Sequence, residues 1–311
     1  MNQFHEIQTL LQEKADLQAR IKLIPYDGNP EIKENASGKY LYMRKRIGSR
    51  LTSTYVDRYS EELYQLLLRN AKELRELKKQ IRKLEKRLAE LGYESENLSN
   101  RILQNLDFAR ANMKANIYDQ AILEGVATSF PQTEDIIDNG TVSGMTANDI
   151  QKILNLKHAW EFILDEDVIQ AKSDYGLLCH IAKLVNEGFF FDGGRIRSVP
   201  VSIGGSSYVP PVPMESMVKE RLQEILAEEK ESIDIAIDLC MYSMKTQIFL
   251  DGNKRAAVIF ANHYLIAHGQ GLLVIPEAHV PAFKRKLVAY YEGEDIAHIR
   301  TFLKEKCWKN F

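Results

Sequence analysis

The chain has 311 residues, and its 41 basic and 43 acidic side chains leave a formal net charge of −2. This length predicts two domains with a sizeable core, and the balanced charge excludes a general attraction to polyanions, so any basic patch must be local. The odd set of three widely spaced cysteines favours a reduced cytoplasmic protein over a disulfide scaffold, and the lack of an export signal or of an apolar run of about 18 residues argues against export or membrane spanning.

Residues 1–96 are predicted to form a helical stalk that bears a β-hairpin. Heptad spacing of apolar residues predicts a helix over 2–24, and the residues concerned are Ile7, Leu10, Leu17, Ile21 and Ile24. Pro25 and a turn cluster at 27–30 end this helix. Aromatic and β-branched runs then predict the two strands of a hairpin within 39–56.

The second helix of the stalk is predicted over 60–91. Eight of its nine heptad seam positions carry Leu or Ile: Leu63, Leu67, Leu74, Leu77, Ile81, Leu84, Leu88 and Leu91, with Asn70 as the exception. At 1.5 Å per residue this rod is roughly 45–50 Å long. We expect it to pair antiparallel with helix 2–24, which leaves the hairpin at the tip. Homodimerisation along this coiled-coil seam is the alternative, because 2–24 is too short to cover all of 60–91.

The stalk also carries basic and aromatic side chains. Residues 72–87 contain eight Lys or Arg and three Glu, and the segment near the tip contains Tyr40, Tyr42, Arg44, Arg46 and Tyr55. Such interleaving is typical of nucleic-acid binders. A long exposed helix also needs charges to solvate its outer face. Since no base-reading module is visible, the solvated face is the preferred interpretation and nucleic acid is the alternative partner.

Residues 97–311 are predicted to form a mainly α-helical domain. A helix over 98–118 runs on towards 126, and further helices are expected over 133–139, 146–164, 167–186, 214–231, 233–244, 253–268, 280–291 and 295–307, with a short strand at 272–276. Alternation over 195–203 and 208–209, on either side of Gly204 and Gly205, predicts a β-hairpin that ends at Pro210.

One segment, TQIFLDGNKRAAV, concentrates residues suited to phosphate binding. A turn at Asp251 and Gly252 precedes a helix that starts at Asn253, and the free N–H groups of such a start form an anion site. Gly252 lets a phosphate approach the backbone. Lys254 and Arg255 supply cations, and Asp251 could hold a divalent cation. In the alternative interpretation, Asp251 only caps the helix and the cations are its solvated first turn.

The segment resembles the central motif of the Fic/Doc (Fido) family, His-x-Phe-x-(Asp/Glu)-(Gly/Ala)-Asn-(Gly/Lys)-Arg, most closely between Phe249 and Arg255. The resemblance implies a Fic-type fold that binds ATP or another nucleoside triphosphate with Mg²⁺ and transfers AMP to a protein hydroxyl. Doc-like members, which have Lys at the position of Lys254, transfer the terminal phosphate instead. It also implies nucleotide binding by Phe249, Gly252, Asn253, Lys254 and Arg255, and metal binding by Asp251.

Gln247 stands where the family has its catalytic His. An amide has no basic nitrogen, so Gln247 can orient a hydroxyl but cannot accept its proton. Losing a positioned base typically costs about 10²–10⁴ in rate. The expectation is therefore a slow transferase, a kinase-like variant directed by Lys254, or a nucleotide-binding pseudoenzyme. An interaction protein that uses the fold as a scaffold, through its coiled coil or by association with nucleic acid, is the alternative from a different class.

Two more stretches share this resemblance. Glu124 and Gly125 match the family's inhibitory element, (Ser/Thr)-x-x-x-Glu-(Gly/Asn), although its Ser/Thr position holds Gln120. In the family this Glu pairs with a second Arg of the central motif, and Val258 stands at that position here. We expect Glu124 to pair with Lys254 or Arg255 and to compete with a phosphate; a plain helix-end residue before a Gly cap is the alternative. The passage around Ile203, Gly204 and Gly205 resembles the family's flap, which aligns a target protein by backbone pairing.

Overall fold

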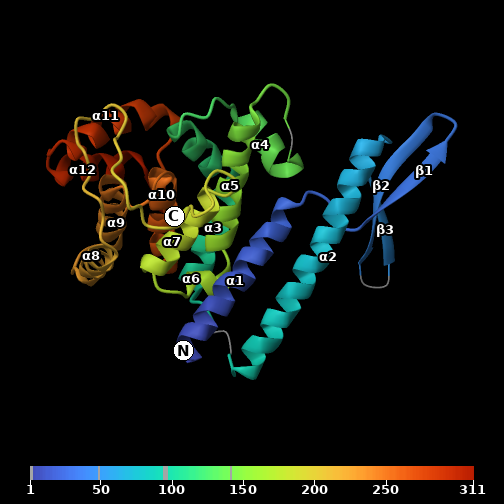
Figure 1. Ribbon diagram of the computed structural model, residues 1–311, viewed down its shortest axis with the longest axis horizontal. Coiled ribbons are helices and arrows are strands. Elements are labelled where there is room, and N and C mark those ends of the chain that lie inside the picture. The colour runs from blue at the N-terminus through green and yellow to red at the C-terminus, as the bar shows by residue number, and fades with distance from the viewer. Residues whose placement is uncertain (1–2, 48–49, 94–96, 141) are drawn as a thin grey trace. The chain divides into compact units, whose positions relative to one another are not determined.

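The computed structural model describes residues 3–47, 50–93, 97–140 and 142–311. The chain forms two compact units, Met1–Glu94 and Ser95–Phe311 (Figure 1). None of the helices in the described part of the chain is long and apolar enough to cross a bilayer.

Two long helices and a small sheet make up the first unit. Helix α1 spans Gln3–Leu23 and α2 spans Glu61–Glu90. They run antiparallel, because Arg20 Nε lies 3.1 Å from Glu73 Oε1 while Arg87 Nη2 lies 2.7 Å from Glu6 Oε1. This antiparallel pairing is the one predicted from the heptads.

Burial along the pair follows the predicted seam in α2 but not in α1. Five seam residues of α2 are buried: Leu67, Leu74, Leu77, Ile81 and Leu88. In α1 the seam residues are only half-buried, and the buried positions are Leu11, Ala15 and Ala19. Their spacing of four follows the rows of a straight helix, from which a strict heptad drifts.

Three antiparallel strands separate the helices, in the order β1-β2-β3: Asn29–Asn35, Gly38–Ile47 and Arg50–Arg58. The predicted hairpin is therefore present as β2 and β3, but β1 was missed. Its sequence, NPEIKEN, is polar and does not alternate. On one side of the sheet, Leu41 and Met43 are buried and pack with Leu67 of α2.

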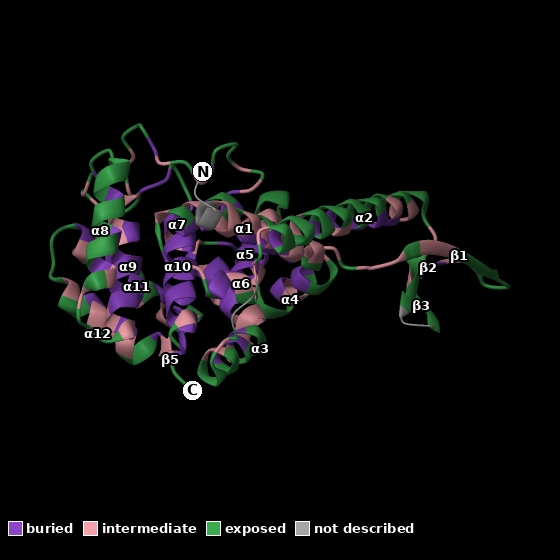
Figure 2. Ribbon diagram, turned by 90° about the horizontal axis from the view of Figure 1, so that it is seen from below, coloured by how far each residue is buried: buried purple, intermediate pink, exposed green. Residues whose placement is uncertain are grey.

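The second unit is built around helix α10. Its helices are α3 (Asn100–Leu123), α4 (Phe130–Asn139), α5 (Ala147–Ile163), α6 (Glu166–Ile169), α7 (Tyr175–Val185), α8 (Glu215–Ala227), α9 (Ser232–Thr246), α10 (Asn253–Ala267), α11 (Val280–Tyr291) and α12 (Ile296–Lys306), with a 3₁₀ turn at Glu277–His279. Helices α3, α5, α7 and α9 all contact α10. As a result, α9 and α10 are buried over most of their length (Figure 2).

Three predictions for this unit need correction. The helix expected over 167–186 is two helices, because Asp174 caps a new helix start within the run. The strand expected near 272 is shortened to β4 (Leu272–Leu273), which pairs with an unpredicted β5 (Trp308–Lys309). The described residues from 195 to 214 contain no strand, so the predicted β-hairpin is an irregular loop with a turn between Ile203 and Ser206. We refer to residues 195–214 as the flap loop.

Candidate functional site

The turn between α9 and α10 is set by an unusual backbone conformation at Gln247. Its φ of 48° and ψ of 61° are left-handed, and it is the one non-glycine residue with positive φ that the structure describes. Gln247 Nε2 donates to Met244 O at 2.6 Å, and Gln247 Oε1 accepts from Asn253 Nδ2 at 3.1 Å. Both ends of the amide are thus engaged within the turn.

Asn253 closes the same turn from the other side. Its Oδ1 accepts from Phe249 N at 2.9 Å, and its Nδ2 donates to Phe249 O at 2.8 Å. Phe249 itself is buried. Asn253 and Phe249, both expected to bind nucleotide, therefore hold the loop in shape in this structure.

Position 252 requires a glycine, because Asn186 lies next to where a Cβ would be. Gly252 has a φ of 76°, and a Cβ there would lie 2.8 Å from Asn186 Nδ2 and Oδ1. Asn186 Nδ2 donates to Gly193 O at 3.1 Å and to Asp251 O at 3.0 Å. A larger residue at 252 would displace this link between the α7 end and the motif. Sequence reasoning missed Asn186, whose long-range bonds leave no periodic signal.

The start of α10 has no side-chain cap among the described residues. Asp251 is therefore not its cap, although one interpretation predicted this. Asp251 Oδ2 instead accepts from Arg255 Nη2 at 2.8 Å. Arg255 is buried rather than solvated, since its side chain is 3% exposed. Its Nη1 also donates to Val185 O at 2.6 Å.

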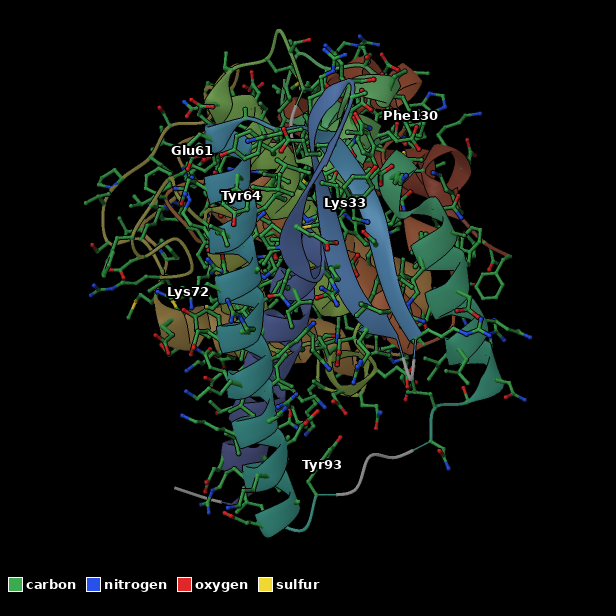
Figure 3. All side chains as sticks on the ribbon, turned by 90° about the vertical axis from the view of Figure 1, so that its right-hand side faces the viewer. Lys33, Glu61, Tyr64, Lys72, Tyr93 and Phe130 are labelled. Carbon is green, nitrogen blue, oxygen red and sulfur yellow. The ribbon has the colours of Figure 1, made fainter. Side chains whose placement is uncertain are left out.

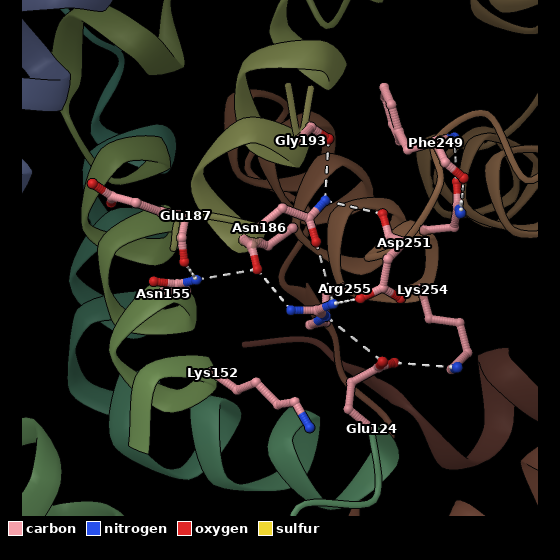
Figure 4. A network of polar contacts seen from close by, with 12 residues as sticks. Glu124, Lys152, Asn155, Asn186, Glu187, Gly193, Phe249, Asp251, Lys254 and Arg255 are labelled. Carbon is pink, nitrogen blue, oxygen red and sulfur yellow. Dashed lines mark hydrogen bonds and ion pairs between the residues drawn. The ribbon is translucent and has the colours of Figure 1, made fainter. Parts of the chain in front are cut away.

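Glu124 faces both cations of the motif (Figure 4). Its Oε1 lies 3.5 Å from Lys254 Nζ, and its Oε2 lies 3.6 Å from Arg255 Nε. The Glu124 side chain is 12% exposed. Glu124 Oε1 and Arg255 Nε are buried, and neither finds a hydrogen-bond partner in the described part of the chain. Buried polar atoms usually have a hydrogen-bond partner. The contacts of Glu124 with Lys254 and Arg255 are therefore ion pairs that leave Glu124 Oε1 and Arg255 Nε without a hydrogen bond.

Gln120 fixes where Glu124 lies. Its Nε2 donates to Arg255 O at 2.9 Å, and its Oε1 accepts from Trp160 Nε1 at 3.1 Å. Gln120 is buried on the last turn of α3, one turn before Glu124. The residue that departs from the Ser/Thr pattern therefore ties α3 to the first turn of α10.

A second arginine holds the flap loop against the motif. Arg197 is buried, and its guanidinium donates to five carbonyl oxygens: Gln247 at 2.5 Å, Val199 and Pro211 at 2.7 Å, Pro210 at 3.2 Å and Thr246 at 3.4 Å. Burial lowers the pKa of this guanidinium. Because Arg197 takes up carbonyls from both arms of the loop, it explains in part why no strand pairing forms. In the sequence, the position of Arg197 within an otherwise apolar alternating run was the feature that could have indicated a buried anchoring residue.

The turn of the flap loop is held by Glu292, the residue that follows α11. Glu292 Oε1 accepts from Ser206 Oγ at 3.1 Å and from Ser207 N at 2.8 Å. Gly204 and Gly205 are exposed, and Ile203 is half-buried. The residues expected to align a target therefore lie at the surface.

Three other titratable groups of the second unit, Asp238, Lys245 and His263, are each engaged in contacts of their own. Asp238 pairs with Lys230 and Arg300. Lys245 Nζ donates to Tyr290 O at 2.8 Å, and burial lowers its pKa. His263 contacts Ser173 and Val168, and burial lowers its pKa to about 4. His158 is buried, and its Nδ1 lies 3.2 Å from Glu187 Oε2.

The residues present suit a phosphate better than an isolated metal ion. An open helix start, two cations and an unpartnered Arg255 Nε all favour an anion. Among the described side chains, no group of three His, Cys, Asp or Glu is placed to hold a metal. Asp251 is a single carboxylate, which fits Mg²⁺ only where phosphates supply further ligands.

Comparison with known proteins agrees with this geometry. Residues 173–265 match the Fic/DOC family, and residues 4–65 match a domain of unknown function (DUF6788). No curated protein sequence matches the chain.

Solved structures resemble the chain at low identity. Fic-1 (amino acids 134–508) from C. elegans is 20% identical with a TM-score of 0.52, over 79% of this chain and 73% of that one. A Fic domain containing signaling protein from Bacteroides thetaiotaomicron VPI-5482 is 17% identical with a TM-score of 0.54, over 68% and 86%. A Fic family protein from Desulfovibrio desulfuricans G20 is 17% identical with a TM-score of 0.52, over 68% and 76%. The mainly helical second unit therefore has a Fic-type fold, and its residues 173–265 match the Fic/DOC family.

Proposed function

We propose that the second unit binds the phosphates of ATP, or of another nucleoside triphosphate, at the start of α10. The observation that supports this most directly is the position of Glu124. Its carboxylate already lies within 3.6 Å of both motif cations without satisfying Arg255 Nε. A phosphate group carries negative charge on several acceptor oxygens, so it could contact Lys254 and also accept a hydrogen bond from Arg255 Nε.

Each group of the site has a role in this proposal. Lys254 and Arg255 neutralise phosphate charge, and the α10 N–H groups hold the phosphate oxygens in place. Mg²⁺, if bound between Asp251 and the phosphates, would add further charge neutralisation. Such positioning and electrostatics supply most of the catalysis in phosphoryl transfer.

We further propose slow transfer to a protein hydroxyl. The hydroxyl oxygen would form a bond to phosphorus while the bond to the leaving pyrophosphate or ADP breaks, and the hydroxyl proton would pass to solvent. Gln247 can orient the hydroxyl but cannot take the proton. Lys254, which corresponds to the Doc-like Lys, favours transfer of the terminal phosphate over AMP.

The target is proposed to lie along the flap loop. Its turn at Ile203, Gly204 and Gly205 is surface-accessible, and its backbone forms no ladder with another described segment. Exposed backbone groups at this turn could hydrogen-bond to an added target segment. This mode tolerates many target sequences.

Two labelled forms of ATP separate the possible activities. The full chain is incubated with Mg²⁺ and lysate proteins, with label at the alpha or the gamma phosphate. Alpha label on protein indicates AMP transfer, and gamma label alone indicates phosphate transfer. Calorimetric binding without either label indicates a nucleotide-binding pseudoenzyme. Absence of both heat and label would overturn the proposal.

A matched pair of variants locates the binding. Arg255→Gln removes a buried site cation, and Lys219→Gln removes an exposed cation of α8. We expect the first to weaken ATP binding at least about tenfold, which corresponds to about 1.4 kcal/mol, and the second to leave it unchanged. Equal effects would assign the binding to general surface charge.

A further inference from the structure

The outer side of the sheet in the first unit carries a cluster that the Fic-type function does not use. Tyr42 lies opposite Tyr55 across β2 and β3, and Tyr40 lies opposite Lys33 across β1 and β2. Successive residues of a strand point to opposite sides, so these side chains share the side that faces away from the buried Leu41. We call Lys33, Tyr40, Tyr42, Arg44, Arg46, Tyr55 and Arg58 the tyrosine face.

The three rings form one contiguous group. The centroids of Tyr42 and Tyr55 lie 5.6 Å apart at an interplanar angle of 71°, and those of Tyr40 and Tyr55 lie 6.3 Å apart at 51°. Tyr55 is 50% exposed, although it is a large hydrophobic residue. The rings thus present aromatic surface to solvent from two adjacent strands.

Cations surround these rings. Lys33 Nζ lies 4.3 Å from the centroid of Tyr42, and Lys33 can be followed on the sheet in Figure 3. Arg44, Arg46 and Arg58 extend the positive charge along β2 and β3, and all three are exposed. Glu31 is the acidic residue opposite Tyr42, and it lies 3.8–3.9 Å from Lys33 and Arg44. Four cations and one Glu therefore give this side a local charge of about +3, against −2 for the whole chain.

Sheet stability explains only part of this arrangement. Cross-strand aromatic pairs contribute roughly 0.2–1 kcal/mol each. The core of the sheet, however, is on the other side, where Leu41 and Met43 pack with Leu67. Exposed rings with arginines at their rim are not needed for that packing.

We propose that the tyrosine face binds single-stranded nucleic acid. Bases stack on exposed aromatic rings regardless of sequence, while Arg and Lys contact the phosphates. A duplex offers the same phosphates but keeps its bases stacked inside, and an acidic peptide would match the charge but leave the rings unused. The combination of rings and cations therefore favours an unpaired strand. This binding is independent of the nucleotide site at α10.

Fluorescence anisotropy with the full chain tests the proposal. The probes are a labelled pyrimidine strand of about 12 nucleotides, a matching duplex and a poly-glutamate peptide, at about 50 and about 200 mM salt. We expect the strand to bind more tightly than the duplex or the peptide, with affinity that falls as salt rises. Absence of strand binding at low salt, or equal binding of the duplex or the peptide, would overturn the proposal.

Variants locate the binding on the sheet. Tyr55→Leu keeps an apolar side chain and removes the ring, so we expect the Kd for the strand to rise about tenfold or more. Tyr55→Trp should retain binding. Lys39→Gln, on β2 but on the opposite side, is the control and should change little, whereas Arg46→Gln should lower the salt slope by about 0.7. Unchanged binding in Tyr55→Leu, with circular dichroism like that of the native chain, would place the contact elsewhere and overturn the assignment.

Discussion

Glu124 Oε2 lies 3.6 Å from Arg255 Nε, close enough for charge attraction but too far for a hydrogen bond. The same carboxylate is 3.5 Å from Lys254 Nζ. The two motif cations thus share one buried acid that satisfies neither fully.

The first prediction follows from this sharing. Glu124 pairs with the two cations that a phosphate would need. Its replacement in Glu124→Gly should therefore tighten ATP binding about tenfold, as measured by isothermal titration calorimetry. Glu124→Gln keeps the shape and removes the charge, so it should give most of the same gain. An unchanged affinity in both variants would mean that Glu124 does not compete with nucleotide.

The second prediction concerns the missing base. Gln247→His places a basic nitrogen at the position from which a hydroxyl proton would be taken, and His is among the residues that tolerate the left-handed backbone of this site. We expect protein labelling from ATP to rise by about 10²–10⁴. Gln247→Asn serves as the control, because Asn tolerates the left-handed backbone but has no basic nitrogen, so labelling should not rise above the native level. If His gave no gain, proton transfer would not be what limits the native chain.

The third prediction concerns the anchor of the flap loop. Arg197→Lys keeps the charge, but an ammonium cannot reach the carbonyls that the planar guanidinium contacts. We expect the free energy of unfolding to fall by about 3 kcal/mol, as measured by urea denaturation, with faster proteolysis between 198 and 214. Arg195→Lys makes the same change at an exposed site of this loop. Similar losses in the two variants would refute an anchoring role.

The fourth prediction is a pH dependence caused by His263. Burial lowers its pKa from 6.5 to about 4, and its Nε2 must carry the proton because Val168 O can only accept. The unfolded chain therefore binds a proton at higher pH than the folded one. Stability from this group is complete above about pH 6.5 and is lost as the pH falls towards 4, by about 3 kcal/mol in total.

The measurement compares His263→Gln with the native chain by denaturation at several pH values. The stability difference between them should shrink as the pH falls from 6.5 to 4. His298→Gln, an exposed histidine, should run parallel to the native chain. A constant difference for His263→Gln would show that the buried imidazole protonates at its ordinary pKa.

Local patterns predicted much of this molecule. The heptads of α2 gave its length and its contact face, whereas the apolar row predicted for α1 is only half-buried. The motif spacing likewise indicated the open start of α10. It also brought Lys254 and Arg255 to the same end of that helix, where Glu124 meets them.

Long-range hydrogen bonding accounts for what was missed. Asn186 and Arg197 join segments 50 or more residues apart, and no periodicity marks such residues. The flap loop alternates like a hairpin, yet Arg197 takes the carbonyls that strand pairing would use. Strand β1 has a polar sequence and depends on its partner β2 for its conformation.

The way Gln247 is held has a consequence for how such a chain changes over time. Its main-chain oxygen accepts a hydrogen bond from Arg197, and its side-chain oxygen accepts one from Asn253. The main-chain oxygen and the side-chain amide of Gln247 therefore both stabilise the turn. Any replacement at position 247 would thus change the shape of the loop together with the chemical character of the site, so the two properties are inherited as one.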